Sequence, residues 1–131
     1  MKKFAVAVAV LLCAAGALAD TVGAHLVTVH DRPGFNGVNP GLYWRGDGGL
    51  TAGAYRNSEN RDSVYGGYTW TGCAWSLSAL VVAGYKAGTV PALVPSYAFG
   101  LGDGVSVRAS LVLNPMKGGA SGVHASVEYR I

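Results

Sequence analysis

Four polar side chains in this sequence have the types needed for acyl transfer: His30, the Asp62-Ser63 pair and His124. A histidine within reach of a serine hydroxyl can remove the hydroxyl proton, and an acidic group can orient the imidazole ring. In this interpretation Ser63 is the nucleophile or a positioning hydroxyl, His30 is the base, and Asp62 orients that base. His124 is the alternative base.

Neighbouring amide and hydroxyl groups would assist such a reaction. Asn57 could donate to an oxyanion, and Tyr55 and Ser58 would position a substrate. The sequence contains no G-x-S-x-G motif, and its three histidines have neither H-x-x-x-H nor H-E-x-x-H spacing. We therefore expect no metal site and no cofactor. The same residue types are common in loops, so a purely structural role for them stays open.

The elements that carry these residues have the pattern of β-strands. After residue 20, apolar and polar residues alternate with a period of two, and turn residues interrupt the alternation. The closing stretch GVHASVEYRI shows this alternation over its whole length. The pattern predicts eight strands, at residues 22–31, 39–46, 49–57, 63–71, 73–85, 90–100, 104–113 and 122–131.

Two of the predicted strands are irregular. His25 and His30 in the first strand have opposite parity, so a regular strand cannot point both into the same space. Pro91 and Pro95 weaken the sixth strand, because proline cannot donate to a ladder.

The predicted connections alternate in length. Those near residues 46–48, 71–72 and 101–104 are tight, whereas RPGFNGVN, SENRD, KAGTV and PMKGGASG are longer. Outer-membrane barrels have short periplasmic turns and longer outer loops. We therefore predict an all-β fold, a single eight-stranded antiparallel up-and-down transmembrane β-barrel. In this topology the candidate site residues gather at the outer rim.

The N-terminus has the pattern of an export signal. Two lysines precede an apolar run that closes on Ala17-Leu18-Ala19, as in secretory signal peptides. We expect residues 1–19 to be the signal peptide and residues 20–131 to form the barrel. Loss of Lys2 and Lys3 would lower the formal charge from +3 to +1. Since no Lys/Arg cluster remains, nucleic acid is not an expected partner.

The composition also favours a membrane barrel over a soluble domain. Half of the residues are hydrophobic and 13% are charged. No second apolar stretch is long enough for a membrane helix, and only helices and closed barrels satisfy their backbone in lipid. Arg45, Arg108 and Glu128 would face the barrel interior, where we expect them to form a structural network that argues against a pore. Outward tryptophans and tyrosines would form interfacial girdles.

By size and layout the chain resembles the small eight-stranded outer-membrane barrels. That group includes OmpX-like structural barrels and the lipid A palmitoyltransferases and deacylases. His30 and the Asp62-Ser63 pair match the order of functional residues around the first two outer loops of the palmitoyltransferases. His124-Ala125-Ser126 has the His-x-Ser spacing of the deacylases. The last strand is similar to the C-terminal signature of outer-membrane proteins, with Ile131 in place of the usual phenylalanine.

This resemblance implies an outer-membrane location, with lipopolysaccharide or phospholipid as partners and the barrel-assembly machinery recognising the last strand. The leading hypothesis is acyl transfer or deacylation of lipid A or phospholipid at the outer-leaflet rim. The alternative is a non-catalytic barrel that stabilises the membrane or takes part in surface interactions, including phage exclusion. A periplasmic or secreted β protein is the alternative location.

Overall fold

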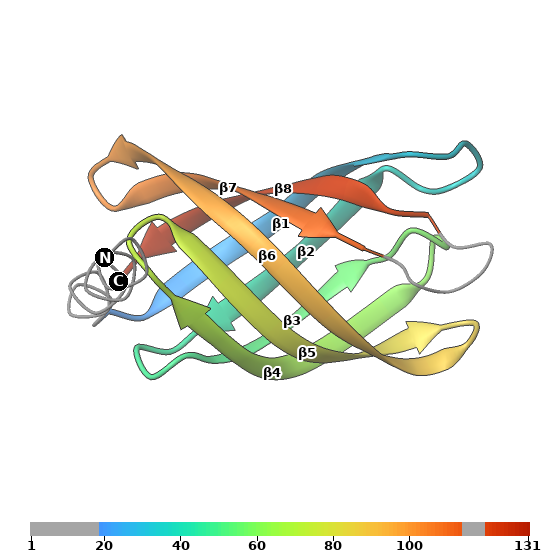
Figure 1. The fold of residues 1–131 in the computed structure, drawn as a ribbon, viewed down its shortest axis with the longest axis horizontal. Helices are drawn as coiled ribbons and strands as arrows, with labels where there is room; N and C mark the ends of the chain where they lie inside the picture. The colour runs from blue at the N-terminus through green and yellow to red at the C-terminus, as the bar shows by residue number, and fades with distance from the viewer. Residues whose placement is uncertain (1–18, 114–119) are drawn as a thin grey trace, which may run out of the picture.

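The alternating pattern becomes eight antiparallel strands that close into a barrel (Figure 1). The computed structural model describes residues 19–113 and 120–131, and the predicted signal peptide, apart from its last residue, lies outside them. Each strand pairs with the next, and β1 pairs with β8 to close the barrel. The prediction of an eight-stranded antiparallel up-and-down barrel is confirmed. The strands are β1 (Thr21–His30), β2 (Val38–Arg45), β3 (Leu50–Arg56), β4 (Asp62–Thr71), β5 (Trp75–Tyr85), β6 (Gly88–Gly102), β7 (Val105–Val112) and β8 (Gly122–Arg130).

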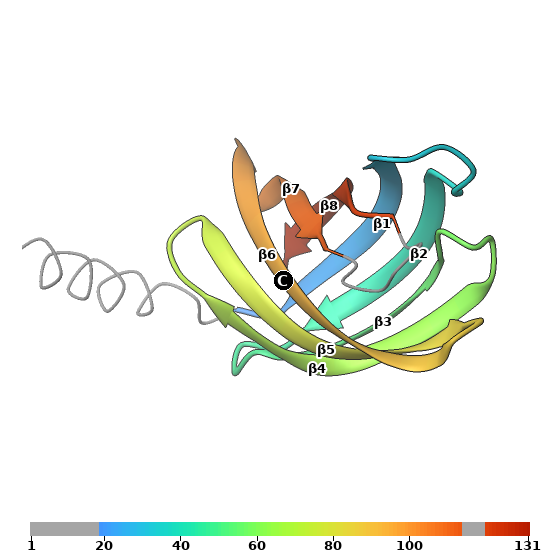
Figure 2. The ribbon, with the colours of Figure 1, turned by 45° about the vertical axis from the view of Figure 1, so that its right-hand side comes forward.

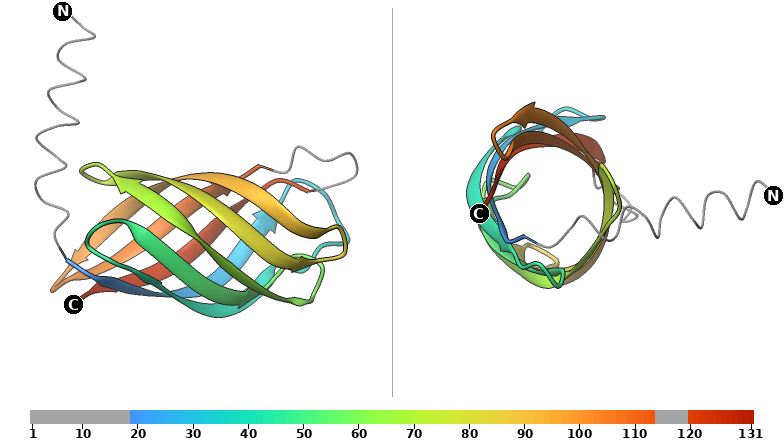
Figure 3. Two further views of the ribbon diagram at one scale, coloured as in Figure 1. Left: turned by 90° about the horizontal axis from the view of Figure 1, so that it is seen from below. Right: turned by 90° about the vertical axis from the view of Figure 1, so that its left-hand side faces the viewer.

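The two ends of the barrel carry different connections (Figure 3). At the end where β1 begins and β8 ends, here called the terminal end, the strands are joined by residues 46–49, 72–74 and 103–104. At the opposite loop end they are joined by residues 31–37, 57–61 and 86–87, and by a β7–β8 connection of which residues 114–119 are not described.

One predicted long connection is wrong. The β5–β6 connection, expected to be a loop, is a two-residue turn of Lys86 and Ala87, because Tyr85 already pairs with Gly88. Gly88 has a φ of 93°, a conformation that glycine adopts without steric cost. As a result β6 begins at Gly88, and β5 and β6 form a long hairpin that sweeps across the barrel wall (Figure 2).

A β-bulge in β1 resolves the parity of the histidines. His25 pairs with Ser126 and Val27 pairs with the preceding residue of β8, Ala125, so Leu26 is the extra residue. A bulge of this kind shifts every later side chain of the strand to the other face. His25 and His30 therefore both line the barrel interior.

The two prolines of β6 lie at positions where a backbone N–H would have no partner strand to bond. Ala98 N donates to the carbonyl oxygen of Ala74, the residue just before β5, at 2.6 Å. The nitrogens of Pro91 and Pro95, at the opposite parity, therefore face β7. Among the described residues, the β6–β7 ladder extends only from the terminal end to Ser96 and Ser110. Beyond that point the prolines face a seam without pairing, which explains why they do not end the strand.

Burial in this barrel is the reverse of that in a soluble protein. Among the described residues, twelve polar or charged residues are buried, against three hydrophobic ones, Tyr43, Val82 and Ala120. Twenty-two large hydrophobic residues are exposed. Soluble domains bury their aliphatic residues, whereas membrane barrels turn an apolar band outward and a polar face inward.

The exposed aromatic residues form a belt at the terminal end. Tyr68 and Trp70 on β4 have ring centroids 4.9 Å apart, and Tyr97 and Phe99 on β6 have the same spacing. The full aromatic belt comprises Trp44, Tyr68, Trp70, Trp75, Tyr97, Phe99 and Tyr129. Such belts lie at membrane–water interfaces. No helix among the described residues is long and apolar enough to cross a membrane.

Candidate functional site

A buried charge cluster divides the barrel interior into two cavities. Arg45 and Arg108 line both a cavity of about 360 Å³ that reaches the loop end and one of about 650 Å³ at the terminal end. Glu128 lies between the two guanidinium groups and accepts from Arg108 Nε at 2.7 Å and Arg45 Nη1 at 3.0 Å. Tyr43 Oη donates to the same carboxylate at 2.6 Å. We call Arg45, Arg108 and Glu128 the charge cluster.

No buried side-chain nitrogen or oxygen of the charge cluster lacks a hydrogen-bond partner, which suits a structural floor. Arg108 Nη1 donates to Ser76 Oγ at 2.6 Å and to Ser96 Oγ at 2.9 Å. Glu128 is 3% exposed and Arg108 is 7% exposed. Buried charges need such partners, and these residues supply them to one another, so their burial requires no ligand. The structure thus places the three residues predicted for an interior network in one contact group.

Above this floor, one wall of the loop-end cavity is aliphatic. Along β5, the inward side chains change from serine at Ser76 and Ser78 to Leu80 and Val82. Along β6 the change occurs one inward pair nearer the terminal end, because Ser76 pairs with Ser96 but Ser78 already pairs with Val94, and Leu80 pairs with Ala92. The aliphatic wall comprises Leu80, Val82, Val90, Ala92, Val94 and Val112.

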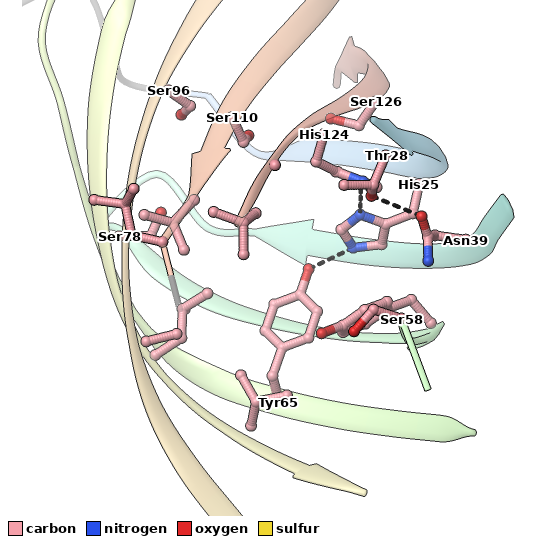
Figure 4. Close-up of a pocket in the computed structure, with 18 of the residues that line it drawn as sticks. His25, Thr28, Asn39, Ser58, Tyr65, Ser78, Ser96, Ser110, His124 and Ser126 are labelled. Atoms are coloured by element: carbon pink, nitrogen blue, oxygen red, sulfur yellow. Dashed lines mark hydrogen bonds between the residues drawn. The ribbon is translucent and has the colours of Figure 1, made fainter. Parts of the chain in front are cut away.

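The facing wall is a continuous chain of polar side chains (Figure 4). Tyr65 Oη lies 2.8 Å from His25 Nε2, and His25 Nδ1 lies 2.8 Å from His124 Nε2. His124 Nδ1 lies 2.8 Å from Thr28 Oγ1, which donates to Asn39 Oδ1 at 2.6 Å. This polar chain, Tyr65–His25–His124–Thr28–Asn39, joins β4, β1, β8 and β2.

The polar chain contains residues that sequence reasoning missed. His25 and Thr28 were not predicted, because they face the same space only through the bulge at Leu26. His124 was predicted at the rim as an alternative base. It is instead 8% exposed and bonded to His25 and Thr28, with no hydrogen bond to a serine among the described residues.

The structure does not bring His30, Asp62 and Ser63 into hydrogen-bond contact. His30 lines the loop-end cavity, and its ring centroid lies 5.6 Å from that of Phe35. The Asp62 side chain is 86% exposed and accepts from Arg56 Nε at 3.0 Å. Ser63 is 2% exposed, and Asn57 Nδ2 donates to its hydroxyl at 2.9 Å.

The predicted positioning residues have separate places. Asn57 is fully buried, and its Oδ1 accepts from the backbone N–H groups of Glu59 and Arg61, so it organises the β3–β4 loop. Tyr55 Oη lies 2.9 Å from Tyr85 Oη. Tyr55, Tyr85, Ser58 and Glu59 all line the loop-end cavity, whereas Asn57 does not.

This geometry suits binding of an apolar chain better than binding of an ion. The donors and acceptors of the polar chain bond to one another, and the charged side chains of the charge cluster are paired. In the part of the chain that the structure describes, no three His, Cys, Asp or Glu side chains are grouped as metal ligands would be. The Thr28–His124 contact is the closest approach to a nucleophile–base pair in the cavity.

Comparison with known proteins supports the fold. No protein-family profile matches the chain, and no curated protein matches it. The chain is similar to a designed transmembrane barrel. The solution NMR structure of the de novo designed TMB2.3 aligns with a TM-score of 0.60 and 13% sequence identity, covering 86% of this chain and 94% of the designed one. At this identity the likeness concerns the fold alone, and the exposed apolar side chains fit a membrane barrel of the same kind.

Proposed function

We propose that this protein is an outer-membrane barrel that binds a hydrocarbon chain of a membrane lipid in its loop-end cavity. The observation that carries the proposal is the aliphatic wall. The inner face of a membrane barrel is ordinarily polar, and the terminal half of this barrel follows that rule. Six aliphatic side chains from three neighbouring strands nevertheless face the cavity at the loop end.

The cavity has the size and chemistry of a site for an apolar chain. Its volume of about 360 Å³ falls within the range of about 300–1,000 Å³ common for small-molecule pockets. Each methylene group buried there would contribute about 0.8 kcal/mol to binding. The charge cluster closes the cavity below, so a bound chain would enter from the loop end or through the unpaired β6–β7 seam.

The rim of the cavity supports contact with a lipid headgroup. His30, Ser58 and Glu59 line it near the loop end. Neither ring nitrogen of His30 makes a hydrogen bond among the described residues, so this histidine has capacity for a ligand. With the loop end facing outward, the headgroup would belong to lipopolysaccharide or to phospholipid in the outer leaflet.

Neighbouring residues of β6 provide a matched test. Ala92 lines the cavity, whereas Leu93 is 59% exposed on the outer face. We expect Ala92→Phe to fill the cavity and weaken binding of a fluorescent palmitoyl probe at least tenfold, while Leu93→Phe leaves binding unchanged. Equal binding by both variants, with both barrels shown to be folded by heat-modifiable gel migration, would contradict the proposal.

Acyl transfer or deacylation is the second candidate function. It is favoured by His30, which lines the same cavity, and by the resemblance that places His30 and the Asp62-Ser63 pair at the outer loops. Mass spectrometry of lipid A and phospholipids from cells expressing the protein tests it. A changed acylation pattern that disappears in Thr28→Val or His124→Gln would support chemistry in the cavity. Loss in His30→Gln or Ser63→Ala alone would support the rim. An unchanged pattern with a folded barrel would leave the non-catalytic role.

The non-catalytic role has its own support. Ser63 is held by Asn57, and Asp62 is paired with Arg56, so both make contacts that a structural loop needs. In that role the protein would take part in membrane stabilisation or surface interactions, and the barrel-assembly machinery would insert it through β8.

A further inference from the structure

The hydrogen positions in the polar chain follow from one residue at its end. Asn39 Nδ2 faces two carbonyl oxygens, Arg56 O at 2.8 Å and Asn36 O at 3.4 Å. Carbonyl oxygens only accept, so the amide nitrogen of Asn39 must lie on this side and Oδ1 must face Thr28. The single hydroxyl hydrogen of Thr28 is therefore donated to Asn39.

Each remaining bond is then determined in turn. Because the Thr28 hydrogen is already used, its oxygen accepts from His124, whose Nδ1 must carry a hydrogen. A neutral imidazole carries one hydrogen, so His124 Nε2 accepts from His25 Nδ1–H. By the same rule His25 Nε2 accepts from the hydroxyl of Tyr65. All four contacts are satisfied with both rings neutral and both protonated on Nδ1.

We propose that Asn39 is a positioning residue that locks the polar chain in this one direction, so that His124 cannot act as a base toward Thr28. This inference does not depend on whether a hydrocarbon chain occupies the cavity. In the locked direction His124 donates to the Thr28 oxygen and offers it no lone pair. Activation of Thr28 would require every hydrogen in the chain to reverse, and Asn39 would have to turn its amide away from the Arg56 carbonyl.

The surroundings of the two rings are consistent with a neutral chain. The ring centroid of His25 lies 4.8 Å from that of Tyr43 and 5.2 Å from that of Tyr55, and neither neighbour is a carboxylate that would favour an imidazolium. The Glu128 carboxylate is taken up by two arginines and Tyr43. An extra proton on His124 Nε2 would place two N–H groups against each other at 2.8 Å.

Ring nitrogen NMR of the full chain tests the proposal. In detergent micelles, with ¹⁵N-labelled histidine, protonated and unprotonated ring nitrogens have widely separated shifts, and His30→Gln removes the signals of the third histidine. The wild type should show the Nδ1–H tautomer for both His25 and His124 near neutral pH. An Nε2–H tautomer or a charged ring at either position would overturn the proposal.

Variants at the two ends of the polar chain separate the lock from mere packing. Asn39→Leu removes the acceptor, so the Thr28 hydrogen should turn to His124 and both rings should change to Nε2–H. Tyr65→Phe removes only a donor and should leave both tautomers as in the wild type. Unchanged tautomers in a folded Asn39→Leu barrel would show that Asn39 does not set the direction. If that variant does not fold, the wild-type and Tyr65→Phe spectra still decide whether the chain has the assigned direction.

Discussion

Replacing Glu128 with alanine should strongly destabilise the barrel. The Glu128 carboxylate accepts two hydrogen bonds from Arg108, two from Arg45 and one from Tyr43, at distances between 2.6 and 3.3 Å. Its side chain is 4% exposed, and those of Arg45 and Arg108 are 11% and 8% exposed. The substitution would leave two guanidinium groups buried without a counter-charge.

The size of the effect can be bounded from the burial of the ion pairs. Removing one partner of a buried pair costs about 3–5 kcal/mol, because the remaining charge stays desolvated. Exposed pairs contribute about 0–1 kcal/mol. The Arg56–Asp62 pair is a control within the same barrel, since its side chains are 42% and 86% exposed. We therefore expect Glu128→Ala to lower the free energy of unfolding by about 3–5 kcal/mol and Asp62→Asn by no more than about 1 kcal/mol.

Equilibrium urea unfolding in lipid vesicles measures both variants. The tryptophans of the aromatic belt report the transition through their fluorescence, and heat-modifiable migration confirms that each variant begins folded. If Glu128→Ala and Asp62→Asn lost the same small amount, the charge cluster would not be the structural floor described here. A Glu128→Gln variant retains shape and some hydrogen bonding, so it should lie between the wild type and Glu128→Ala.

Two further substitutions test packing and membrane contact. An added Cβ at Gly23 would overlap the ring of Tyr43, whereas one at Gly100 would meet open space. Gly23→Ala should therefore lower the free energy of unfolding by about 1–3 kcal/mol, and Gly100→Ala by less than about 0.5 kcal/mol. Denaturant midpoints measure both variants, and equal losses of stability would contradict this packing. Leu42 is 72% exposed on the middle of β2, so Leu42→Arg should cost about 2–4 kcal/mol in a bilayer. Pro33 is exposed in the β1–β2 loop, so Pro33→Arg should cost little. A harmless Leu42→Arg would argue against a lipid-facing surface.

Much of the fold could be predicted because the sequence pattern and the strand geometry share one period. Alternation of two residues places apolar side chains outside and polar ones inside, and the turns near residues 46–49 and 103–104 have the glycines that tight hairpins need. Strand order alone places Arg108 and Glu128 on neighbouring strands. The closed-barrel fold can therefore be predicted from local features of the sequence that agree with one another.

The polar chain was harder to predict because it depends on an irregularity. A bulge inserts one residue without any marker in the sequence, and Leu26 has an ordinary strand side chain. Without the bulge, His25 and Thr28 would face opposite sides of β1. The aliphatic wall was hard to predict for another reason. Leu80 and Val82 have the parity of Ser76 and Ser78, but membrane barrels usually have a polar inner face. Only the paired registers of β5 and β6 therefore identify the aliphatic wall.

Contacts between lipid chains and inward valines test the central claim most directly. Val82 and Val94 line the cavity, whereas Val81 is 57% exposed on the outer face. In a deuterated barrel with protonated valine methyl groups, reconstituted with protonated phospholipid or lipopolysaccharide, nuclear Overhauser cross-peaks report which methyl groups touch lipid chains. We predict cross-peaks from chain methylenes to Val82 and Val94 as well as to Val81. Cross-peaks to Val81 alone, with Val82 and Val94 in contact with water, would contradict the proposed hydrocarbon site.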